Sequence, residues 1–353
     1  MVVVKKALIF GCLLFVLSAC QFRSESPQHW RHLAMGTWVD ITIYDQTPIN
    51  EISPRLAKLL DDAHQRWHAW HPSELSRINE SFAQGRCVQV APTTAQLIRL
   101  AKQLWQASDG LFDAGIGQLL KLWGFQRENM LAAWQPPEDK EINDWLASHP
   151  SIHDVYFVNN RQLCSRNPKV SLDFGGFGKG FILQLVSQSL SHLGITNHMV
   201  NGGGDIIIAG QPPHRPWRIA IQNPFAKEKV LATIELSGKK SIFTSGTYER
   251  HWQHQGITYH HILDPRTARP AQGTVSVTVI GDDPVWMDAA ATAILIAGPK
   301  CAARLADKMR VHAWLVIDHK GVAYLNTAMK NWIEWVTPPQ SIKLIKQSTA
   351  CTR

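Results

Sequence analysis

The 353-residue chain lacks metal-binding cysteine motifs, a basic stripe, and any long apolar run after its first twenty residues. Its six cysteines include no CxxC pair, which argues against a zinc or iron–sulfur site held by cysteines. The charges are scattered, so the formal net charge of +8 does not support nucleic-acid binding. No second stretch of about eighteen apolar residues predicts a membrane-spanning helix. What is present, 45% hydrophobic residues, suffices for a large buried core.

The N-terminus has the pattern of a bacterial lipoprotein signal. Lys5 and Lys6 form a basic start, residues 7–16 are apolar, and small residues precede Cys20. An ordinary secretory signal needs no cysteine after its cleavage point, so we expect residues 1–19 to be removed and Cys20 to carry lipid. The alternative is a plain signal peptide or a single anchor helix. We therefore predict a lipidated tether over 20–29 and a protein anchored by lipid to a membrane of the bacterial cell envelope, facing the periplasm.

Four further cysteines, Cys87, Cys164, Cys301 and Cys351, remain in the mature chain. An oxidising periplasm would permit a bridge between Cys87 and Cys164. No spacing requires that bridge, and the expected state is free, buried thiols.

Helical and strand patterns follow one another in an order that predicts an α+β fold. Mainly antiparallel sheets packed with helices are expected, because the strands between 217 and 280 have no helix between them. The domain is expected over 30–340, with a C-terminal tail over 341–353. Apolar spacing predicts helices over 54–70, 92–108, 138–147, 179–193, 287–297 and 299–309. Strands are predicted over 32–44, 154–163, 169–172, 198–200, 206–209, 217–222, 230–236, 241–244, 259–263, 274–280, 313–317 and 321–325.

Residues 171–180, Ser-Leu-Asp-Phe-Gly-Gly-Phe-Gly-Lys-Gly, form the most informative segment. Its glycines allow a backbone to approach a ligand closely, and Lys179 at the start of a predicted helix can bind phosphate. The segment is not a Walker loop, because Asp173 and Gly180 occupy positions where that loop needs glycine and Ser or Thr. It therefore predicts part of a site for a phosphorylated ligand.

Asp288 and Thr292 lie one turn apart on a predicted helix, so their side chains share one face. A carboxylate with a hydroxyl suits Mg²⁺, which takes few protein oxygens and adds substrate phosphate. The alternative is an aspartate that stabilises the helix macrodipole while Thr292 is merely packed.

Three other patterns have competing interpretations. Residues 201–205 (Asn-Gly-Gly-Gly-Asp) predict either a backbone surface at the ligand or a tight turn. His64, His68 and His71 have helical spacing that would permit zinc, but the pattern is more typical of surface and packing. Ser245 lacks the GxSxG context of a nucleophilic serine.

Taken in chain order, eight segments resemble the ApbE family of FAD:protein FMN transferases. The resemblance implies a single ApbE-like catalytic domain, related to the T-fold. It also implies an enzyme that uses Mg²⁺ to cleave FAD, joins FMN by a phosphoester to a threonine of a target protein, and releases AMP. The implied acceptor is a subunit of a membrane redox complex or a periplasmic flavoprotein. The matching segments are residues 34–37, 73–79, 112–125, 173–180, 201–205, 245–250, 260–267 and 288–292.

The resemblance also implies roles for particular residues. Asp288 and Lys179 would be catalytic, because they would act where charge develops on the pyrophosphate. The metal ligands would be Asp288, Thr292 and the backbone carbonyl of Gly176. Contacts to FAD would come from Met35, Trp70, Asp113, Ala114, Gly115, Asp173, Lys179 and Ile262.

The chain departs from the family pattern at three places. Gly115 stands where relatives commonly have Thr, Thr247 where some have Asp, and Ala268 where Gly is common. Thr247 removes one candidate general base. Two alternatives therefore stay open: an FAD pyrophosphatase that produces FMN and AMP, and a flavin-binding lipoprotein without turnover.

Overall fold

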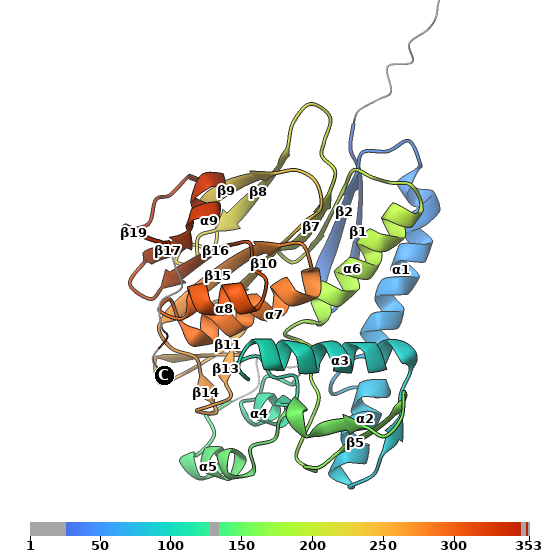
Figure 1. The fold of residues 1–353 in the computed structure, drawn as a ribbon, viewed down its shortest axis with the longest axis vertical. Helices are drawn as coiled ribbons and strands as arrows, with labels where there is room; N and C mark the ends of the chain where they lie inside the picture. The colour runs from blue at the N-terminus through green and yellow to red at the C-terminus, as the bar shows by residue number, and fades with distance from the viewer. Residues whose placement is uncertain (1–25, 128–133, 347–350, 352–353) are drawn as a thin grey trace, which may run out of the picture.

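The computed structural model describes residues 26–127, 134–346 and 351, and a nine-stranded sheet forms its centre (Figure 1). Neighbouring strands are antiparallel except for the parallel pair β17–β19. The predicted α+β class with mainly antiparallel strands is confirmed. In spatial order the strands are β1 (Gln28–Ala34), β2 (Thr37–Ile43), β6 (His198–Gly202), β7 (Asp205–Ala209), β10 (Lys240–Gly246), β15 (Thr274–Gly281), β16 (Ala313–Asp318), β17 (Val322–Asn326) and β19 (Ser341–Ile345).

Helices cover one face of this sheet. The helices α1 (Ile49–Arg66), α6 (Gly178–His192) and α7 (Pro284–Ala297) pack on β1, β6, β10 and β15, with α8 (Ala302–Lys308) beside α7 (Figure 1). Their apolar stripes meet the inward residues of the strands in the main hydrophobic core, which includes Leu56, Leu183, Val200, Val277 and Ile294.

A smaller sheet covers part of the opposite face. Its strands are β8 (Trp217–Gln222), β9 (Val230–Leu236) and β18 (Ile333–Trp335), and α9 (Thr327–Trp332) lies beside it. The alternating buried and exposed residues of β8 are typical of a strand with one face in a core. A second hydrophobic core forms there, from Ile219 and Ile234 on one side and Ile208, Ile242 and Leu315 on the other.

The remaining elements form the lower part of the molecule in Figure 1. A third cluster rich in tryptophan, including Trp123, Trp145 and Trp252, holds several of them together. The helices are α2 (Glu74–Ala83), α3 (Pro92–Ala107), α4 (Gly117–Leu122), α5 (Asp139–Ser148) and the 3-10 turn Ile152–Asp154. The short strands are β3 (Val88–Gln89), β4 (Val155–Phe157), β5 (Gln162–Ser165), β11 (His251–His254), β12 (Ile257–His260), β13 (Leu263–Asp264) and β14 (Arg269–Pro270).

The N-terminal elements differ from their prediction. The strand predicted over 32–44 is a hairpin, because Met35 (φ 55°) and Gly36 (φ 73°) adopt left-handed conformations that turn the chain. The hairpin begins at Gln28, inside the segment expected as a tether. Helix α1 begins before Pro54, and the Ser53 hydroxyl donates to the Asn50 carbonyl, which has no N–H partner at Pro54.

Other elements were missed or are absent. Helix α2 follows a capping box between Ser73 and Ser76, a start signal that the prediction did not use. Residues 169–172 form a single bridge between Ser171 and Ile116 instead of a strand. The segment expected as a C-terminal tail contributes β19 to the main sheet. In contrast, α3, α6, β9 and β15 lie where they were predicted, within two residues.

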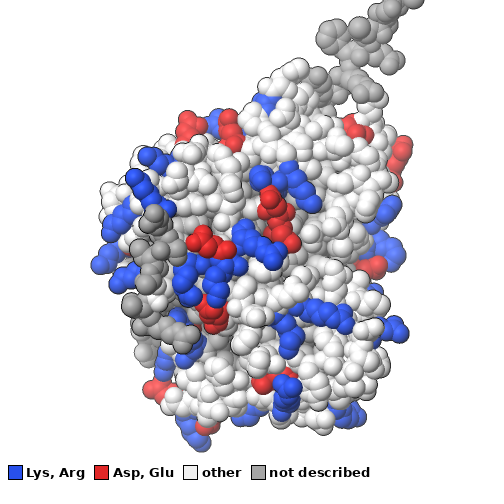
Figure 2. All heavy atoms as spheres, viewed as in Figure 1, with Lys and Arg blue, Asp and Glu red and all other residues white. Residues whose placement is uncertain are grey.

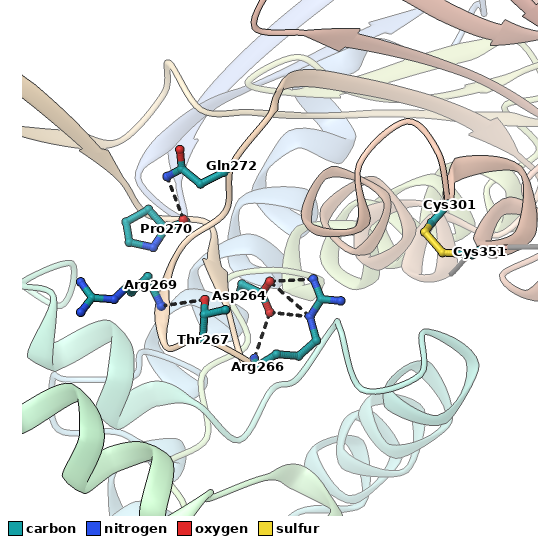
Figure 3. A network of polar contacts seen from close by, with 8 residues as sticks. All are labelled: Asp264, Arg266, Thr267, Arg269, Pro270, Gln272, Cys301 and Cys351. Atoms are coloured by element: carbon teal, nitrogen blue, oxygen red, sulfur yellow. Dashed lines mark hydrogen bonds and ion pairs between the residues drawn. A yellow bond between two sulfur atoms is a disulfide. The ribbon is translucent and has the colours of Figure 1, made fainter. Parts of the chain in front are cut away.

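The expectation of free thiols is wrong. Cys87 and Cys164 form a disulfide, because the pairing of β3 with β5 brings their Cα atoms to 4.3 Å. A second disulfide joins Cys351, near the end of the chain, to Cys301 just before α8 (Figure 3). The linked residues are 77 and 50 positions apart, so each bond closes a long loop.

The charges on the surface and the lengths of the helices are where signs of nucleic-acid or membrane binding would appear. Figure 2 shows Lys and Arg side chains dispersed among Asp and Glu on the face that it draws. Among the described helices, none combines the length and apolar character needed to cross a membrane. The predicted signal at 1–19 and Cys20 lie outside the described residues.

His198 predicts a loss of stability in acid. Its ring is fully buried, Nδ1 donates to the Ile195 carbonyl at 3.0 Å, and Nε2 accepts from the Ser187 hydroxyl at 2.8 Å. Burial lowers the pKa of His198 below its usual 6.5, so the unfolded chain binds the proton first. The free energy of unfolding should therefore fall as pH drops below about 6.5, by up to about 1.4 kcal/mol per pH unit for this group.

Urea unfolding between pH 5 and 8 measures this effect. His198→Gln should make the acid side of the profile less steep, and the slope that remains comes in part from His260 and His261, whose pKa values are also lowered. His192→Gln, at an exposed position on α6, is the matched control and should keep the wild-type slope. An unchanged slope in His198→Gln would assign acid sensitivity to other groups.

Candidate functional site

The start of α6 lies directly against α7, and Gly180 makes this approach feasible. A Cβ atom at Gly180 would lie 2.5 Å from the Pro284 carbonyl oxygen and 3.0 Å from Cβ of Asp288. The Gly180 N–H donates to Oδ2 of Asp288 at 2.8 Å. The glycine-rich segment and Asp288, more than a hundred residues apart in the sequence, therefore meet at one place.

Lys179 forms an ion pair with Asp205, a residue that the sequence analysis treated only as part of a turn. Asp205 begins β7, its side chain is 3% exposed, and its Oδ1 accepts a hydrogen bond from the Thr244 N–H at 3.1 Å. The lysine side chain remains 33% exposed. The sequence did contain a signal for this role. Asp205 directly follows three glycines at the start of a strand, and a turn of that kind can hold a carboxylate toward a ligand site.

The two aspartates and the lysine form one electrostatic unit. Burial, and then the charge of Asp205, raise the pKa of Asp288 to about 7, against the opposing effect of Lys179. Burial by itself would lower the pKa of Lys179, but Asp205 and Asp288 raise it above its usual value. Lys179 is therefore a fixed positive charge, and Asp288 is a carboxylate whose ionised form needs a cation nearby.

The predicted metal ligands offer oxygen donors. The hydroxyls of Thr292 and Ser245 are 3.1 Å apart, and Gly176 lies in the turn before α6 with the Phe112 ring beside its Cα. Within the described ranges, no three His, Cys, Asp or Glu side chains cluster in a way that could hold a metal ion. An ion at Asp288 would thus rely on hydroxyl, carbonyl and substrate oxygens, a donor set that fits Mg²⁺.

Asp173 lies at the other end of the glycine-rich segment. It accepts hydrogen bonds from the Gly175 N–H at 2.7 Å and from Nε2 of Gln126 at 2.8 Å. Arg250 donates to the Phe125 carbonyl and lies close enough to interact with Asp173. These contacts place the segments 122–125 and 245–250 at the glycine-rich segment.

His261 is held as a neutral ring near the same place. Its Nδ1 donates to the Arg250 carbonyl at 3.1 Å, because a carbonyl can only accept. Burial, and then the charge of Arg250, lower the pKa of His261 to about 3. The ring therefore stays uncharged at neutral pH, and its Nε2 is left as an acceptor.

The segment 113–115 lies beside Asp173, but the Asp113 side chain is engaged in structure. Its carboxylate accepts from the Ser151 hydroxyl, the Ile152 N–H and the Gly115 N–H, at 2.6 to 2.9 Å. Asp173 N–H donates to the Ala114 carbonyl at 2.9 Å. A Cβ at Gly115 would lie 2.3 Å from the Ile152 nitrogen, so this backbone position has no room for a side chain.

Met35 and Ile262 belong to the main hydrophobic core or pack against it, whereas Trp70 lines a separate cavity. Met35 packs on the main core at the β1–β2 turn, and Ile262 is buried with its carbonyl bonded to the Ala271 N–H. Trp70 is 39% exposed and lines a cavity of about 610 Å³ beside α2. A larger cavity of about 930 Å³ also lies beside α2 and includes none of the predicted site residues.

The three histidines considered for zinc pack on one another. His68 accepts from the His71 N–H at 3.2 Å, and the His68 ring lies edge-on to His64, His71 and Trp70. Packing accounts for their spacing.

The segment 260–267 ends in a turn that Asp264 organises. Arg266 donates from its backbone N–H and its guanidinium to the Asp264 carboxylate, at 2.7 to 3.2 Å (Figure 3). Ala268 then adopts φ +54°, a left-handed conformation, and its carbonyl accepts from the Trp123 indole at 2.8 Å. Glycine adopts this conformation without strain, whereas an alanine adopts it at a cost.

Gly180→Ala tests the contact between α6 and α7. The added methyl group should separate the helices, lengthen the hydrogen bond to Asp288 and lower the free energy of unfolding by about 1–3 kcal/mol. Urea unfolding measures the change. Gly178→Ala is the matched control, because its Cβ would lie 3.4 Å from Cβ of Phe174, which is an ordinary van der Waals contact. Equal stability of the two variants would contradict the proposed crowding.

Comparisons with known proteins agree with this geometry. The sequence matches the ApbE family over residues 35–315. A FAD:protein FMN transferase of Rhodobacter capsulatus is 37% identical over 277 residues, which cover 77% of this chain and 51% of that protein. The chain thus spans about half the length of that relative. A FAD:protein FMN transferase of Vibrio cholerae is 28% identical over 313 residues, covering 86% of this chain and 91% of that protein.

Solved structures give the same result. The ApbE protein of Thermotoga maritima aligns with a TM-score of 0.79 at 30% identity, covering 87% of this chain and 99% of that one. The flavin transferase ApbE from Vibrio cholerae aligns with a TM-score of 0.76 at 28% identity, with the same two coverages. The family match includes every segment that brings Lys179, Asp205 and Asp288 together, and the chain belongs to the ApbE family.

Proposed function

We propose that the chain is a Mg²⁺-dependent FAD:protein FMN transferase that attaches FMN through a phosphoester to a threonine of a target protein and releases AMP. The observation that carries the proposal is the cluster of Lys179, Asp205 and Asp288 at the start of α6. The chain belongs to the ApbE family, and its relatives in R. capsulatus and V. cholerae are named FAD:protein FMN transferases.

The reaction moves one phosphoryl group between two oxygens. The threonine hydroxyl oxygen bonds to the phosphorus of the FMN half, the bond from that phosphorus to the bridging oxygen breaks, and AMP leaves with that oxygen. The hydroxyl proton passes to solvent. Lys179 supplies a positive charge for the diphosphate. Asp205 already holds the lysine ammonium group in place, so little reorganisation accompanies the reaction. The positive end of the α6 macrodipole, at Gly178 and Lys179, favours the same anion.

Asp288, Thr292 and the Gly176 carbonyl are the proposed Mg²⁺ ligands. The ion, when bound, supplies Lewis-acid neutralisation of diphosphate oxygens. Asp288 is suited to this role because burial disfavours its charge, which a bound cation would compensate. Gly180 and Ser245 orient the two side-chain ligands through the hydrogen bonds to Asp288 and Thr292.

The remaining FAD contacts are proposed from position and from the family resemblance. The segment 113–115 lies beside Asp173. Met35 and Ile262 pack in or against the main core, and their contacts to FAD are proposed from the family resemblance. Trp70 exposes an indole ring in its cavity, which suits stacking on a flavin or adenine ring.

The location is proposed to be the periplasmic side of a bacterial membrane, with lipid on Cys20. The signal pattern at 1–20 supports this location. The two disulfides support it too, because such bonds persist in oxidising compartments. A membrane redox subunit or a periplasmic flavoprotein would then be within reach as the acceptor.

One specific observation favours the FAD pyrophosphatase alternative. The Thr247 hydroxyl lies 3.4 Å from the Val275 carbonyl, to which it donates, so it provides no base for an acceptor threonine. A flavin-binding lipoprotein without turnover is the third candidate.

One experiment separates the three functions. Mature protein is incubated with FAD, Mg²⁺ and the membrane fraction of a strain that lacks its gene. Transfer predicts a mass gain of one FMN on a threonine-containing peptide, together with AMP. FMN and AMP without labelled protein would indicate hydrolysis, and unchanged bound FAD would indicate storage.

A further inference from the structure

The outer face of the β1–β2 hairpin changes character near its turn. Three residue pairs face each other across the strands on this side, His29 with Thr42, Arg31 with Asp40, and Leu33 with Trp38. His29 and Thr42 are hydrogen-bonded, and Arg31 and Asp40 form an ion pair. Leu33 and Trp38 are apolar, yet they are 58% and 51% exposed.

No described element covers this pair. The smaller sheet β8–β9–β18 covers the outer face over β7, β10 and β15–β17, and its core contains no residue of β1 or β2. Helix α1 packs on the hairpin, where the main core takes its inward residues Val39 and Ile41. The Arg31 guanidinium lies 5.6 Å from the centroid of the Trp38 ring, yet both Leu33 and Trp38 remain more than half exposed. They therefore form an exposed apolar pair on a face whose other two pairs are polar, as expected for a solvated sheet face.

The pair lies next to the candidate site. The Trp38 carbonyl accepts a hydrogen bond from the Gly203 N–H at 3.2 Å, and two residues later Asp205 pairs with Lys179. Gly36, Gly203 and Gly204 are exposed around it, and a Cβ at Gly36 or Gly204 would meet no other atom within 4 Å. The surface thus combines two apolar side chains with bare backbone at the edge of the site.

We propose that Leu33 and Trp38 form a docking surface for the protein substrate and hold the segment that carries the acceptor threonine. This inference rests on the proposed transfer of FMN. A transferase of this kind must place a polypeptide across the edge of its site, because the hydroxyl has to reach the FAD diphosphate. An exposed tryptophan beside a leucine provides an apolar anchor of the type that dominates protein–protein interfaces.

A lipid surface suits the pair less well. The predicted anchor leads into Gln28, at the far end of β1 from Leu33. Gln28 and Leu33 are five residue steps apart along the strand, about 17 Å. The pair instead lies at the turn that faces the site. Its position favours a partner that must reach Lys179 and Asp288.

The test compares Leu33→Ser/Trp38→Ser with the wild type and with a matched control. Phe225→Ser is the control, because Phe225 is also 58% exposed but lies between β8 and β9. Each protein is incubated with FAD, Mg²⁺ and the membrane fraction of the strain that lacks the gene. Covalent FMN is measured by in-gel flavin fluorescence. FAD affinity is measured separately by flavin fluorescence on binding.

The double variant should transfer FMN at least tenfold more slowly at limiting acceptor, with FAD affinity within twofold of wild type. More acceptor should restore its rate, and Phe225→Ser should behave as wild type. Wild-type rates in the double variant would overturn the proposal, and so would a parallel loss of FAD affinity, which would place the pair in the flavin site. Binding to protein-free vesicles of phosphatidylethanolamine and phosphatidylglycerol that falls with the double substitution would assign the pair to lipid and also overturn it. A wild-type protein that labels no acceptor would refute the transfer function instead.

Discussion

Asp288→Asn is expected to lower the rate of FMN transfer about a hundred- to a thousandfold, the largest effect of any single conservative change. Asparagine has the same shape and can still accept the hydrogen bond from the Gly180 N–H. It removes only the negative charge, so it isolates the role of Asp288 as a charged ligand to Mg²⁺. The rate is measured by AMP release and covalent FMN at saturating FAD, over a range of Mg²⁺ concentrations.

Stability provides the check on this variant. Burial raises the pKa of Asp288 to about 7, so the ionised carboxylate destabilises the metal-free fold at higher pH. The asparagine variant should therefore unfold at the same or a higher temperature than wild type at pH 8 without Mg²⁺. Asp282→Asn, at a side chain that is 78% exposed and paired with Lys240, is the matched control and should keep full activity. Full activity in Asp288→Asn would remove Asp288 from the proposed site.

The prediction from sequence succeeded where a local pattern determines the structure. The periodicity of 92–108 and of 179–193 is repeated over several turns, and the structure places α3 and α6 there. Residue spacing on a helix also placed Asp288 and Thr292 correctly on α7. What failed depends on contacts between distant segments. The β17–β19 pair and the disulfide between Cys301 and Cys351 need partners that no local pattern names.

Asp205 shows the same limit inside the site. Its sequence context, three glycines before a strand, is equally typical of a tight turn, and only the fold shows that Lys179 lies opposite it. The two residues are 26 positions apart and belong to different elements, α6 and β7. An isolated charge in a short motif is thus a weak signal until a partner is known. The assignment of Asp205 therefore needs a direct test of its coupling to Lys179.

A double-mutant cycle between Lys179 and Asp205 should reveal strong coupling. Lys179→Met leaves Asp205 and Asp288 as buried acids without a cation, and should lower the free energy of unfolding by about 3 kcal/mol. Asp205→Asn leaves the lysine partly exposed and able to meet solvent, so its effect should be smaller. In the double variant the stability loss should be less than the sum of the two, by about 1–3 kcal/mol, because the second change removes the unpaired charge.

Activity separates the two roles in the same cycle. Lys179→Met should reduce FMN transfer about a hundredfold. The ammonium group that Asp205 holds beside the diphosphate is lost, and no other cation of the described residues forms an ion pair with Asp205 to replace it. Asp205→Asn retains the ammonium but frees it to move, which should raise the KM for FAD more than it lowers kcat. Urea unfolding and steady-state AMP release measure both quantities, with Lys240→Met as a control at a surface ion pair. Strictly additive changes in stability would mean that Lys179 and Asp205 act independently, and Asp205 would then be a structural residue of the β6–β7 turn.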